Sequence, residues 1–356
     1  MAFTGNKRTY WAVEGLGTAT RGAGPTVASY THMPGVQSVG LSVNYNLEQI
    51  FQLGQLEIYQ DLEDIPDVEV TIEKVIDDTI LAYTRCIDPS NANNQQAKTL
   101  TEFQDTAVDL CLSIHRSATA GANLAVNNVG DDEGLNAAYM SGMFVSAVNF
   151  NFPTDGYFSE SITLVGDHQK WFVPAAADVF QGAPTAGAED VGDVARRQNI
   201  TFGDGAAGIA NMPDPLDSLT DTDDIRIVNI SVSTDLGREQ MFSLGERQSY
   251  HRFVTFPVEV TCDIEAYVTD VAQMGKDALP ESTNVTSNQP IKFFVTDAAS
   301  GGITGAGAAQ HTFDLGAYNA LQSVTWNGLS TDGTNATVTY SYRNFNTLTI
   351  TSTAAM

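Results

Sequence analysis

The chain has 356 residues, 42% of them hydrophobic, so it is long enough for two globular domains that each bury a core. Its 17 Lys and Arg against 43 Asp and Glu give a formal net charge of −26, which excludes a surface that holds nucleic acid by replacing its counterions. No run of about eighteen apolar residues predicts a membrane span, and the N-terminus lacks the apolar segment of a secretory signal.

The acidity permits two interpretations. It keeps the protein soluble, and it also provides a surface along which DNA passes without adhering. Composition alone does not decide between them.

Alternation of apolar and polar residues predicts a mainly β chain. In the first half, the predicted strands cover 36–43, 68–75, 107–116, 143–152 and 157–166, the last two joined by a turn at 153–156. In the second half they cover 226–232, 258–268, 291–297, 321–326, 336–342 and 346–352, with a closing turn at 343–345. The best helical candidates are the segments 87–104 and 271–282.

An internal repeat links the two halves. EQIFQLGQLEIY at 48–59 matches EQMFSLGERQSY at 239–250 with a constant offset of 191 residues, and VEVT at 68–71 matches 258–261 with an offset of 190. A match of this length with one insertion is very improbable by chance, so the chain is predicted to contain two copies of one unit. Each copy is a strand, a long connection of about twenty residues and a second strand.

The second strand of each copy has one predicted buried face. Val68, Val70 and Ile72 alternate with polar residues in the first copy, and Val258, Val260, Cys262 and Ile264 do so in the second. Because side chains alternate across a strand, these two sets are expected to face the core. The three cysteines (Cys86, Cys111 and Cys262) are widely spaced and are expected to be reduced and buried.

The run from the first strand through E-x-Φ-F-x-L-G-x4-Y to P-V-E-V-T resembles the tail tube proteins of long-tailed phages. NFNFPTDGYFSESITLVGDHQKW (149–171) is similar to the closing hairpin of those proteins. The resemblance covers roughly 36–171 and 225–352. It implies two tandem antiparallel β-sandwich or half-barrel domains, each with a short helix and a long β-hairpin connection. The expected parts are a first domain with an N-terminal arm (1–172), a linker (173–224) and a second domain (225–356).

The same resemblance implies an assembly. In this family six tube domains form a ring, their inner strands join into one barrel around a channel, and stacked rings form the tube that conducts DNA into the host. With two domains per chain, three chains are expected to close a pseudo-hexameric ring. The implied partners are further copies of the chain and the tail terminator, tape measure and tip or baseplate proteins. The implied location is the virion tail, assembled in the host cytoplasm.

The resemblance assigns ring-to-ring contacts to the long connections, where apolar residues stand in a polar segment. The expected contact residues are Glu48, Phe51, Leu53, Gly54, Tyr59, Glu239, Phe242, Leu244, Gly245 and Tyr250. The alternative is that these residues pack back onto their own domain.

The polar faces of the inner strands are candidates for the channel lining. They carry Glu69, Thr71, Glu73, Asn149, Asn151, Ser161, Thr163, Glu259, Thr261, Asp263 and Glu265. An acidic and polar lining would not hold DNA. The alternative is that this face lies on the outside, and the sequence does not decide between the two.

No pattern predicts catalysis, a metal site or a cofactor. Gly203–Gly208 matches GxGxxG but precedes prolines instead of a helix, and Asp221–Asp224 lacks the rest of a calcium loop. The five histidines have no ligand spacing, although Cys111 and His115 would share a strand face. A structural protein is therefore expected and not an enzyme. The alternatives are a hub or distal-tail adaptor at the end of a tube and a secreted two-domain β-sandwich adhesin.

Overall fold

The computed structural model describes residues 14–90, 98–102, 105–114, 136–174, 180–182, 193–202, 213, 225–245, 249–268, 290–296, 309–327 and 335–352. These residues form a mainly β protein, which confirms the predicted fold class. The described helices are one α-helix, α1 (Ala82–Ile87), and the 3-10 turns η2 (Val27–Ser29) and η3 (Arg197–Asn199).

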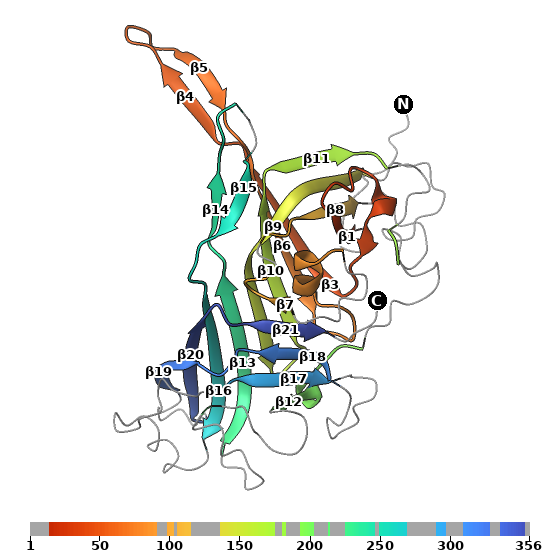
Figure 1. Ribbon diagram of the computed structural model, residues 1–356, viewed down its shortest axis with the longest axis vertical. Helices are drawn as coiled ribbons and strands as arrows, with labels where there is room; N and C mark the ends of the chain where they lie inside the picture. The colour runs from red at the N-terminus through yellow and green to blue at the C-terminus, as the bar shows by residue number, and fades with distance from the viewer. Residues whose placement is uncertain are drawn as a thin grey trace, which may run out of the picture.

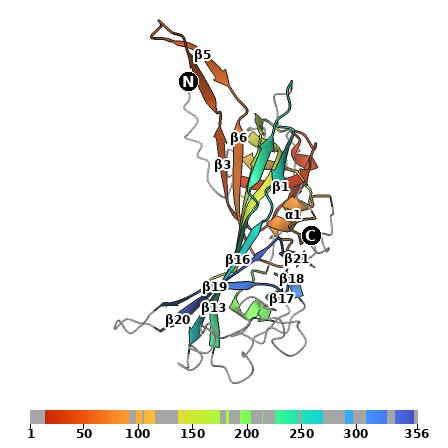
Figure 2. The same cartoon turned by 60° about the vertical axis from the view of Figure 1, so that its left-hand side comes forward.

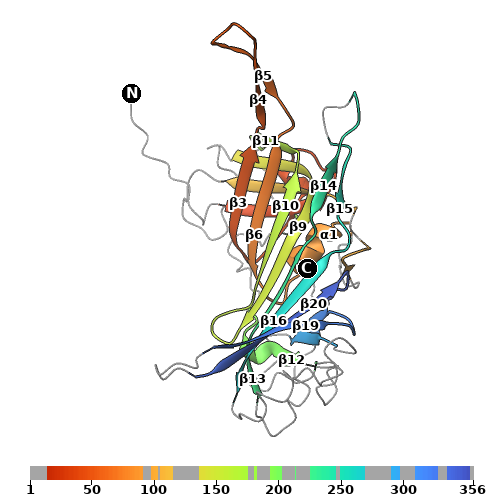
Figure 3. The ribbon, with the colours of Figure 1, turned by 90° about the vertical axis from the view of Figure 1, so that its left-hand side faces the viewer.

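One long antiparallel sheet runs through the whole molecule (Figures 1 and 3). From one edge to the other, its strands are β3 (Val36–Asn44), β6 (Asp67–Val75), β10 (Ser159–Gly166), β9 (Asn136–Pro153), β13 (Ile225–Asp235), β16 (Glu259–Val268), β20 (Thr337–Phe345) and β19 (Ala320–Asn327). The sequence therefore contributes four neighbouring strands from its first half and four from its second.

The strand order of the first half is the same as that of the second. β3 and β6 flank the first long connection as β13 and β16 flank the second, and the hairpin β9–β10 takes the place of β19–β20. The two sets of four strands join where β9 pairs antiparallel with β13, from Pro153 opposite Asn229 to Ala147 opposite Asp235.

Shorter strands cover one face of this sheet (Figure 2). Beside the first half lie β1 (Glu14–Thr20), β2 (Thr31–His32), β8 (Val108–Ile114) and β11 (His168–Phe172), which pair with one another or with the long strand β9. Beside the second half lies a five-stranded sheet of β12 (Ile200–Phe202), β17 (Lys292–Thr296), β18 (Ala309–Asp314), β21 (Thr349–Ser352) and β7 (Lys98–Thr99).

The two halves share one hydrophobic core. Phe152 of β9 meets Phe293 of β17 edge to face at 5.0 Å and Phe313 of β18 at 5.1 Å. β7, from the first half, pairs with β21 at the end of the chain, and β12, from the stretch expected as a linker, pairs with β17. The covering layer is thus built from segments that lie far apart in the sequence.

The predicted alternation is confirmed. Val68, Val70 and Ile72 are at most 1% exposed, and so are Val258, Val260, Cys262 and Ile264 of the second half. All three cysteines are free and buried, as expected. Burying these side chains against the covering layer is the main contribution to stability, at about 25 cal/mol per Å² of apolar surface.

Two local predictions were wrong. The helix of the first half is α1 at 82–87, whereas Lys98–Thr99, within the predicted helical segment, forms β7. Residues 343–345, predicted as the closing turn of the second half, are the last residues of β20. The other helical candidate, 271–282, lies outside the described residues.

α1 depends on a partner distant in the sequence. The carboxylate of Glu160 on β10 accepts hydrogen bonds from the backbone N–H groups of Ala82 (2.5 Å) and Tyr83 (3.3 Å), which have no partner inside the helix. Glu160 is 1% exposed and lies opposite Lys74 of β6. A helix of one and a half turns is unstable alone, so its position follows from this contact and not from propensity.

Burial raises the pKa of Glu160 to about 7, although Lys74 and the two N–H groups oppose the shift. Because the unfolded value is near 4.5, folding takes up a proton, and the contribution of Glu160 to stability falls as the pH rises from 4.5 to 7. We expect Glu160→Gln to lose this dependence, so that its stability relative to wild type rises by up to about 3 kcal/mol across that range. Urea unfolding at a series of pH values measures this, and parallel curves for the two proteins would contradict it.

Candidate assembly interface

Two β-hairpins project from the same end of the long sheet (Figure 1). They are the two repeated connections. The first is β4 (Leu47–Phe51) and β5 (Ile58–Glu63), and the second is β14 (Arg238–Met241) and β15 (His251–Val254).

The tip of each hairpin presents a leucine. In the first, the N–H of Gln55 donates to the carbonyl of Gln52 (3.2 Å), and Gly54 has φ +90°, which describes a type II turn with glycine at its third position. Gly245 of the second hairpin has φ +95°. A residue with a side chain is strained at this φ, so the turn requires the glycine of each Leu-Gly pair.

The predicted contact residues are exposed, and equivalent ones are exposed to the same degree. Leu53 and Leu244 are 102% and 105% exposed, Phe51 and Phe242 65% and 61%, and Tyr59 and Tyr250 61% and 65%. Glu48 and Glu239 are exposed as well. These apolar side chains therefore do not pack back onto their own domain, and they form two apolar tips in an otherwise acidic protein.

The two hairpins differ at their bases. Every residue of β4 and β5 is exposed. In contrast, Arg252 and Val254 of β15 are buried against the first half of the chain, where Arg238 lies over the ring of Phe144 at 5.3 Å.

Charge holds the base of the second hairpin in place. Arg252 Nη2 donates to Asp167 Oδ1 (2.5 Å) and to Asp67 Oδ1 (3.0 Å), and Gln240 Nε2 donates to both carboxylates at 3.2 and 3.1 Å. Burial of Asp67 opposes its ionisation, but hydrogen bonds from Asn46 and Arg252 hold its pKa below the usual value. The Asp67 carboxylate is thus ionised at neutral pH, and the bonds from Arg252 to the two aspartates fix the hairpin.

The face of the long sheet opposite the covering layer is polar. The predicted lining residues all lie on it and are exposed or half-buried: Glu69, Thr71 and Glu73 on β6, Asn149 and Asn151 on β9, Ser161 and Thr163 on β10, and Glu259, Thr261, Asp263 and Glu265 on β16. The residues predicted from the sequence therefore share one face of the sheet. The residues of β13, which lies between β9 and β16, were not among those predicted.

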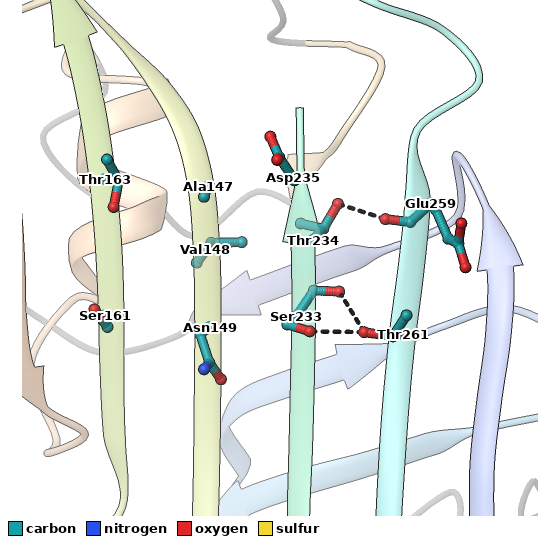
Figure 4. Close-up of a pocket in the computed structure, with 10 residues that line it drawn as sticks. All are labelled: Ala147, Val148, Asn149, Ser161, Thr163, Ser233, Thr234, Asp235, Glu259 and Thr261. Atoms are coloured by element: carbon teal, nitrogen blue, oxygen red, sulfur yellow. Dashed lines mark hydrogen bonds between the residues drawn. The ribbon is translucent and has the colours of Figure 1, made fainter. Parts of the chain in front are cut away.

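This polar face continues across the join of the two halves (Figure 4). Side chains of Ser161, Asn149, Ser233 and Thr261 stand in a row on four neighbouring strands and line a shallow depression. The hydroxyls of Ser233 and Thr261 are 2.6 Å apart and hydrogen-bond to each other. Arg226 and Arg343 bring cations to the same face.

The sheet has two open edges, which the sequence analysis did not identify. β3 pairs with β6 on one side, and β19 pairs with β20 on one side. Val39 and Leu41 of β3 and Leu321 and Val324 of β19 contact the core but are only half-buried, because no strand lies beyond them in the described part of the chain. Edges of this kind are templates for pairing with another chain.

His311 is buried, and its ring bonds the carbonyl of Asp77 and the hydroxyl of Ser352. Within the described ranges no group of three or more His, Cys, Asp or Glu is arranged for a metal ion, and no helix is long and apolar enough to cross a membrane. His115 and the segments 203–208 and 221–224 lie outside the described residues.

We expect Arg252→Ala to loosen the second hairpin, since the variant removes the bonds to Asp67 and Asp167. Breaking such partly buried pairs lowers the local opening free energy by about 2 kcal/mol, so amide exchange in 238–254 should accelerate more than tenfold. Mass spectrometry of exchanged peptides measures this. The 47–63 peptides, which share no contact with Arg252, are the internal control, and unchanged exchange in 238–254 would contradict the expectation.

The solved structures that resemble this chain include a tube-terminating cap and a chain of a sheath–tube complex. The tube-terminating cap of the anti-feeding prophage (AFP) is 14% identical, covers 49% of this chain and 99% of its own, and has a TM-score of 0.31. A chain from the extended sheath–tube complex of PVC, an extracellular contractile injection system, is 13% identical, covers 47% of this chain and 92% of its own, and has a TM-score of 0.30. No protein-family profile and no curated protein sequence matches the chain.

Proposed function

We propose that this chain is the structural subunit of a phage-type tail tube, in which rings of three chains stack into a hollow conduit for DNA. The observation that supports this most is the join of β9 to β13 between two halves of identical strand order. A sheet that joins its second half to its first can repeat the same join to the first half of another chain. In that case β19 of one chain pairs with β3 of the next, and both open edges disappear.

The equivalence of β3 and β13 follows from their pairing. In the first half, Val39 pairs with Ile72. In the second half, Val232 pairs with Cys262. Ile72 and Cys262 occupy the same place in the repeated VEVT strand at an offset of 190, so Val39 is equivalent to Val232.

The other side of the join follows in the same way. Glu160 on β10 pairs with Lys74, and Tyr340 on β20 pairs with Ile264, the equivalent of Lys74 at the offset of 190, so Glu160 and Tyr340 are equivalent at an offset of 180. Glu160 also pairs with Phe150, and Tyr340 with Val324. Phe150 is therefore equivalent to Val324. Since Phe150 pairs with Val232 inside the chain, Val324 is expected opposite Val39 of the next chain, and the edge residues Leu321 and Leu41 also meet. This register places apolar edge residues against apolar edge residues, which supports the proposal.

Three chains give three times eight, or 24, strands, which corresponds to the six tube domains per ring implied by the sequence resemblance. For 24 strands about 4.8 Å apart and tilted by about 40°, a closed barrel has a backbone diameter of roughly 45–50 Å. A channel of this width admits a DNA duplex after the inner side chains are added.

The polar face is the one that lines the channel in this assembly. The opposite face carries the covering strands β1, β8 and β11 and the five-stranded sheet, and a closed barrel has room for a second layer only on its outside. The inner surface then presents hydroxyl, amide and carboxylate groups, such as Ser233, Asn149 and Glu259. The carboxylates of Glu69, Glu73, Glu259, Asp263 and Glu265 outnumber Arg226 and Arg343 on this face, so it repels phosphate on balance and DNA slides through without binding.

The hairpin tips fit the contact between rings. Both point the same way along the sheet, and their leucines and aromatics are exposed apolar groups that a second ring would bury. At the ends of the tube, the same surfaces would meet the tail terminator, the tape measure protein and the tip proteins. The protein is then part of the virion tail, is assembled in the host cytoplasm and has a structural rather than a catalytic role.

A disulfide tests the register of the ring. Asn151 pairs with Ser231, and their equivalents at the proposed junction are Thr325 and Ser38. We expect the double variant Ser38→Cys/Thr325→Cys to form, on oxidation, a covalent closed ring of three chains, because directly opposed residues have Cβ atoms about 5 Å apart. Denaturing non-reducing electrophoresis counts the chains.

The control is Ser42→Cys/Thr325→Cys, which moves one cysteine four residues out of register and should remain uncoupled. The three native cysteines are buried and do not compete. A product of six chains, or no product, would refute the three-chain ring.

A second prediction concerns stacking. We expect Leu53→Ser/Leu244→Ser to abolish filaments and leave rings, because both tips lose the apolar side chain that the next ring buries. Negative-stain microscopy of wild type should show open-ended hollow filaments. The matched control is Leu56→Ser, which alters an equally exposed leucine at a position of the first connection that the second copy does not share. Wild-type protein that stops at isolated rings would favour an adaptor at the end of a tube.

A further inference from the structure

The base of the second hairpin rests on Phe144, Asp67 and Asp167 of the first half, and this contact surface is called its seat. In contrast, every residue of β4 and β5 in the first hairpin is exposed. We infer that the base of the first hairpin docks on the second half of the neighbouring chain in the same ring, so that each β19–β3 junction is closed by a side-chain contact as well as by strand pairing. The inference rests on the proposed ring. It concerns the lateral contact between chains and not the contact of the tips with the next ring.

The contact inside the chain provides the template. The second hairpin rises between β13 and β16 and leans back over the neighbouring strand β9, where the Nε of Arg238 donates to the carbonyl of Val145 (2.8 Å). Its guanidinium and the ring of His251 cover Phe144, whose side chain is only 5% exposed. The first hairpin rises between β3 and β6, and in the ring the strand beside it is β19 of the neighbour.

The equivalent of Phe144 is Tyr318. Val145, next to Phe144, pairs with Leu164 of β10. Asn319, next to Tyr318, is 1% exposed and is bonded by Asn344 of β20, whose Nδ2 donates to its Oδ1 at 2.7 Å. Leu164 and Asn344 are equivalent at an offset of 180, so the two aromatic side chains occupy the same place on the two halves.

The equivalent residues are covered in one half and exposed in the other. Tyr318 is 76% exposed, whereas Phe144 is covered by Arg238. At the hairpin offset of 191, Arg238 corresponds to Leu47, which is 63% exposed. Leu47 of one chain therefore packs on Tyr318 of the next, with an aliphatic–aromatic contact in place of the cation–aromatic one.

The charges have changed together on both sides of this contact. Arg252 meets Asp67 and Asp167 inside the chain, and its equivalent in the first hairpin is Asp61. In the second half, Pro257 takes the position of Asp67 (offset 190), and Thr347 takes the position of Asp167 (offset 180). Had the aspartates been retained, Asp61 would face two like charges. Instead, it faces a surface where those acids are missing, and this makes the seat compatible with the acidic first hairpin.

A cross-link tests the contact. The background is Leu53→Ser/Leu244→Ser, in which rings are expected not to stack. We expect Leu47→Cys/Tyr318→Cys in this background to be coupled by a short bis-maleimide into a closed species of three chains. Glu57→Cys/Tyr318→Cys, with one cysteine near the hairpin tip, is the control and should give little coupling. Failure of the first pair while Ser38→Cys/Thr325→Cys still closes the ring would overturn the seat alone. Failure of both pairs would overturn the ring and the seat together.

A titration of assembly measures the strength of the seat. We expect Tyr318→Ser to raise the concentration at which half of the chains are in rings by at least tenfold, because every junction loses its apolar contact. Tyr267→Ser, an exposed tyrosine on the polar face, is the matched control and should shift that concentration by less than twofold. Equal shifts for the two variants, or coupling of Leu47→Cys/Tyr318→Cys into species larger than three chains, would refute a seat within the ring.

Discussion

The pairing of β9 with β13 is the interaction on which the rest of the structure depends. It places Phe150 beside Val232 on the core face and Asn149 beside Ser233 on the polar face, so both faces run without interruption from one half to the other. A slip of one residue would turn Ser231 and Ser233 into the core, which makes the register strongly specified. The core that enforces it comes from both halves, since Phe152 packs on Phe293 and Phe313.

A repeated unit can change at equivalent places, and the two hairpins show how. The motif residues that form the turn and those that are exposed at the tip are shared by both hairpins. Leu53 and Leu244, for example, are fully exposed in both. The bases differ. The second hairpin contacts the first half of the chain through Arg238 and Arg252, whereas the first hairpin has Leu47 and Asp61 at the equivalent positions. If the two halves were identical, either hairpin base could make the contact within the chain or the proposed contact between chains. Because the two bases differ, each is suited to one of these contacts.

Local sequence patterns predicted the parts of the fold that local physics determines. The alternation of Val68, Val70 and Ile72 gave the strand and its buried face, and the repeated Leu-Gly pair gave two exposed tips. The position of α1 could not be predicted, because Glu160 caps it from a distant strand, and neither could β7 and β12, which pair far along the chain. One available signal was missed. Thr154-Asp155-Gly156 recurs as Thr331-Asp332-Gly333, between the strands that correspond to β9 and β10.

The acidity of the chain has a further consequence for assembly. An antiparallel sheet with open edges at β3 and β19 and two apolar hairpin tips would aggregate readily in a neutral protein. A net charge of −26 on every chain opposes that association, while the proposed register of Val39 with Val324 and the proposed contact of Leu47 with Tyr318 would favour one geometry only. Charge repulsion is screened beyond about 8 Å at physiological salt, so it acts mainly between chains that are already close, where only well-matched apolar contacts offset it. In the proposed tube, the charge that would let DNA pass would therefore also restrict the chain to assembling through its matched edges.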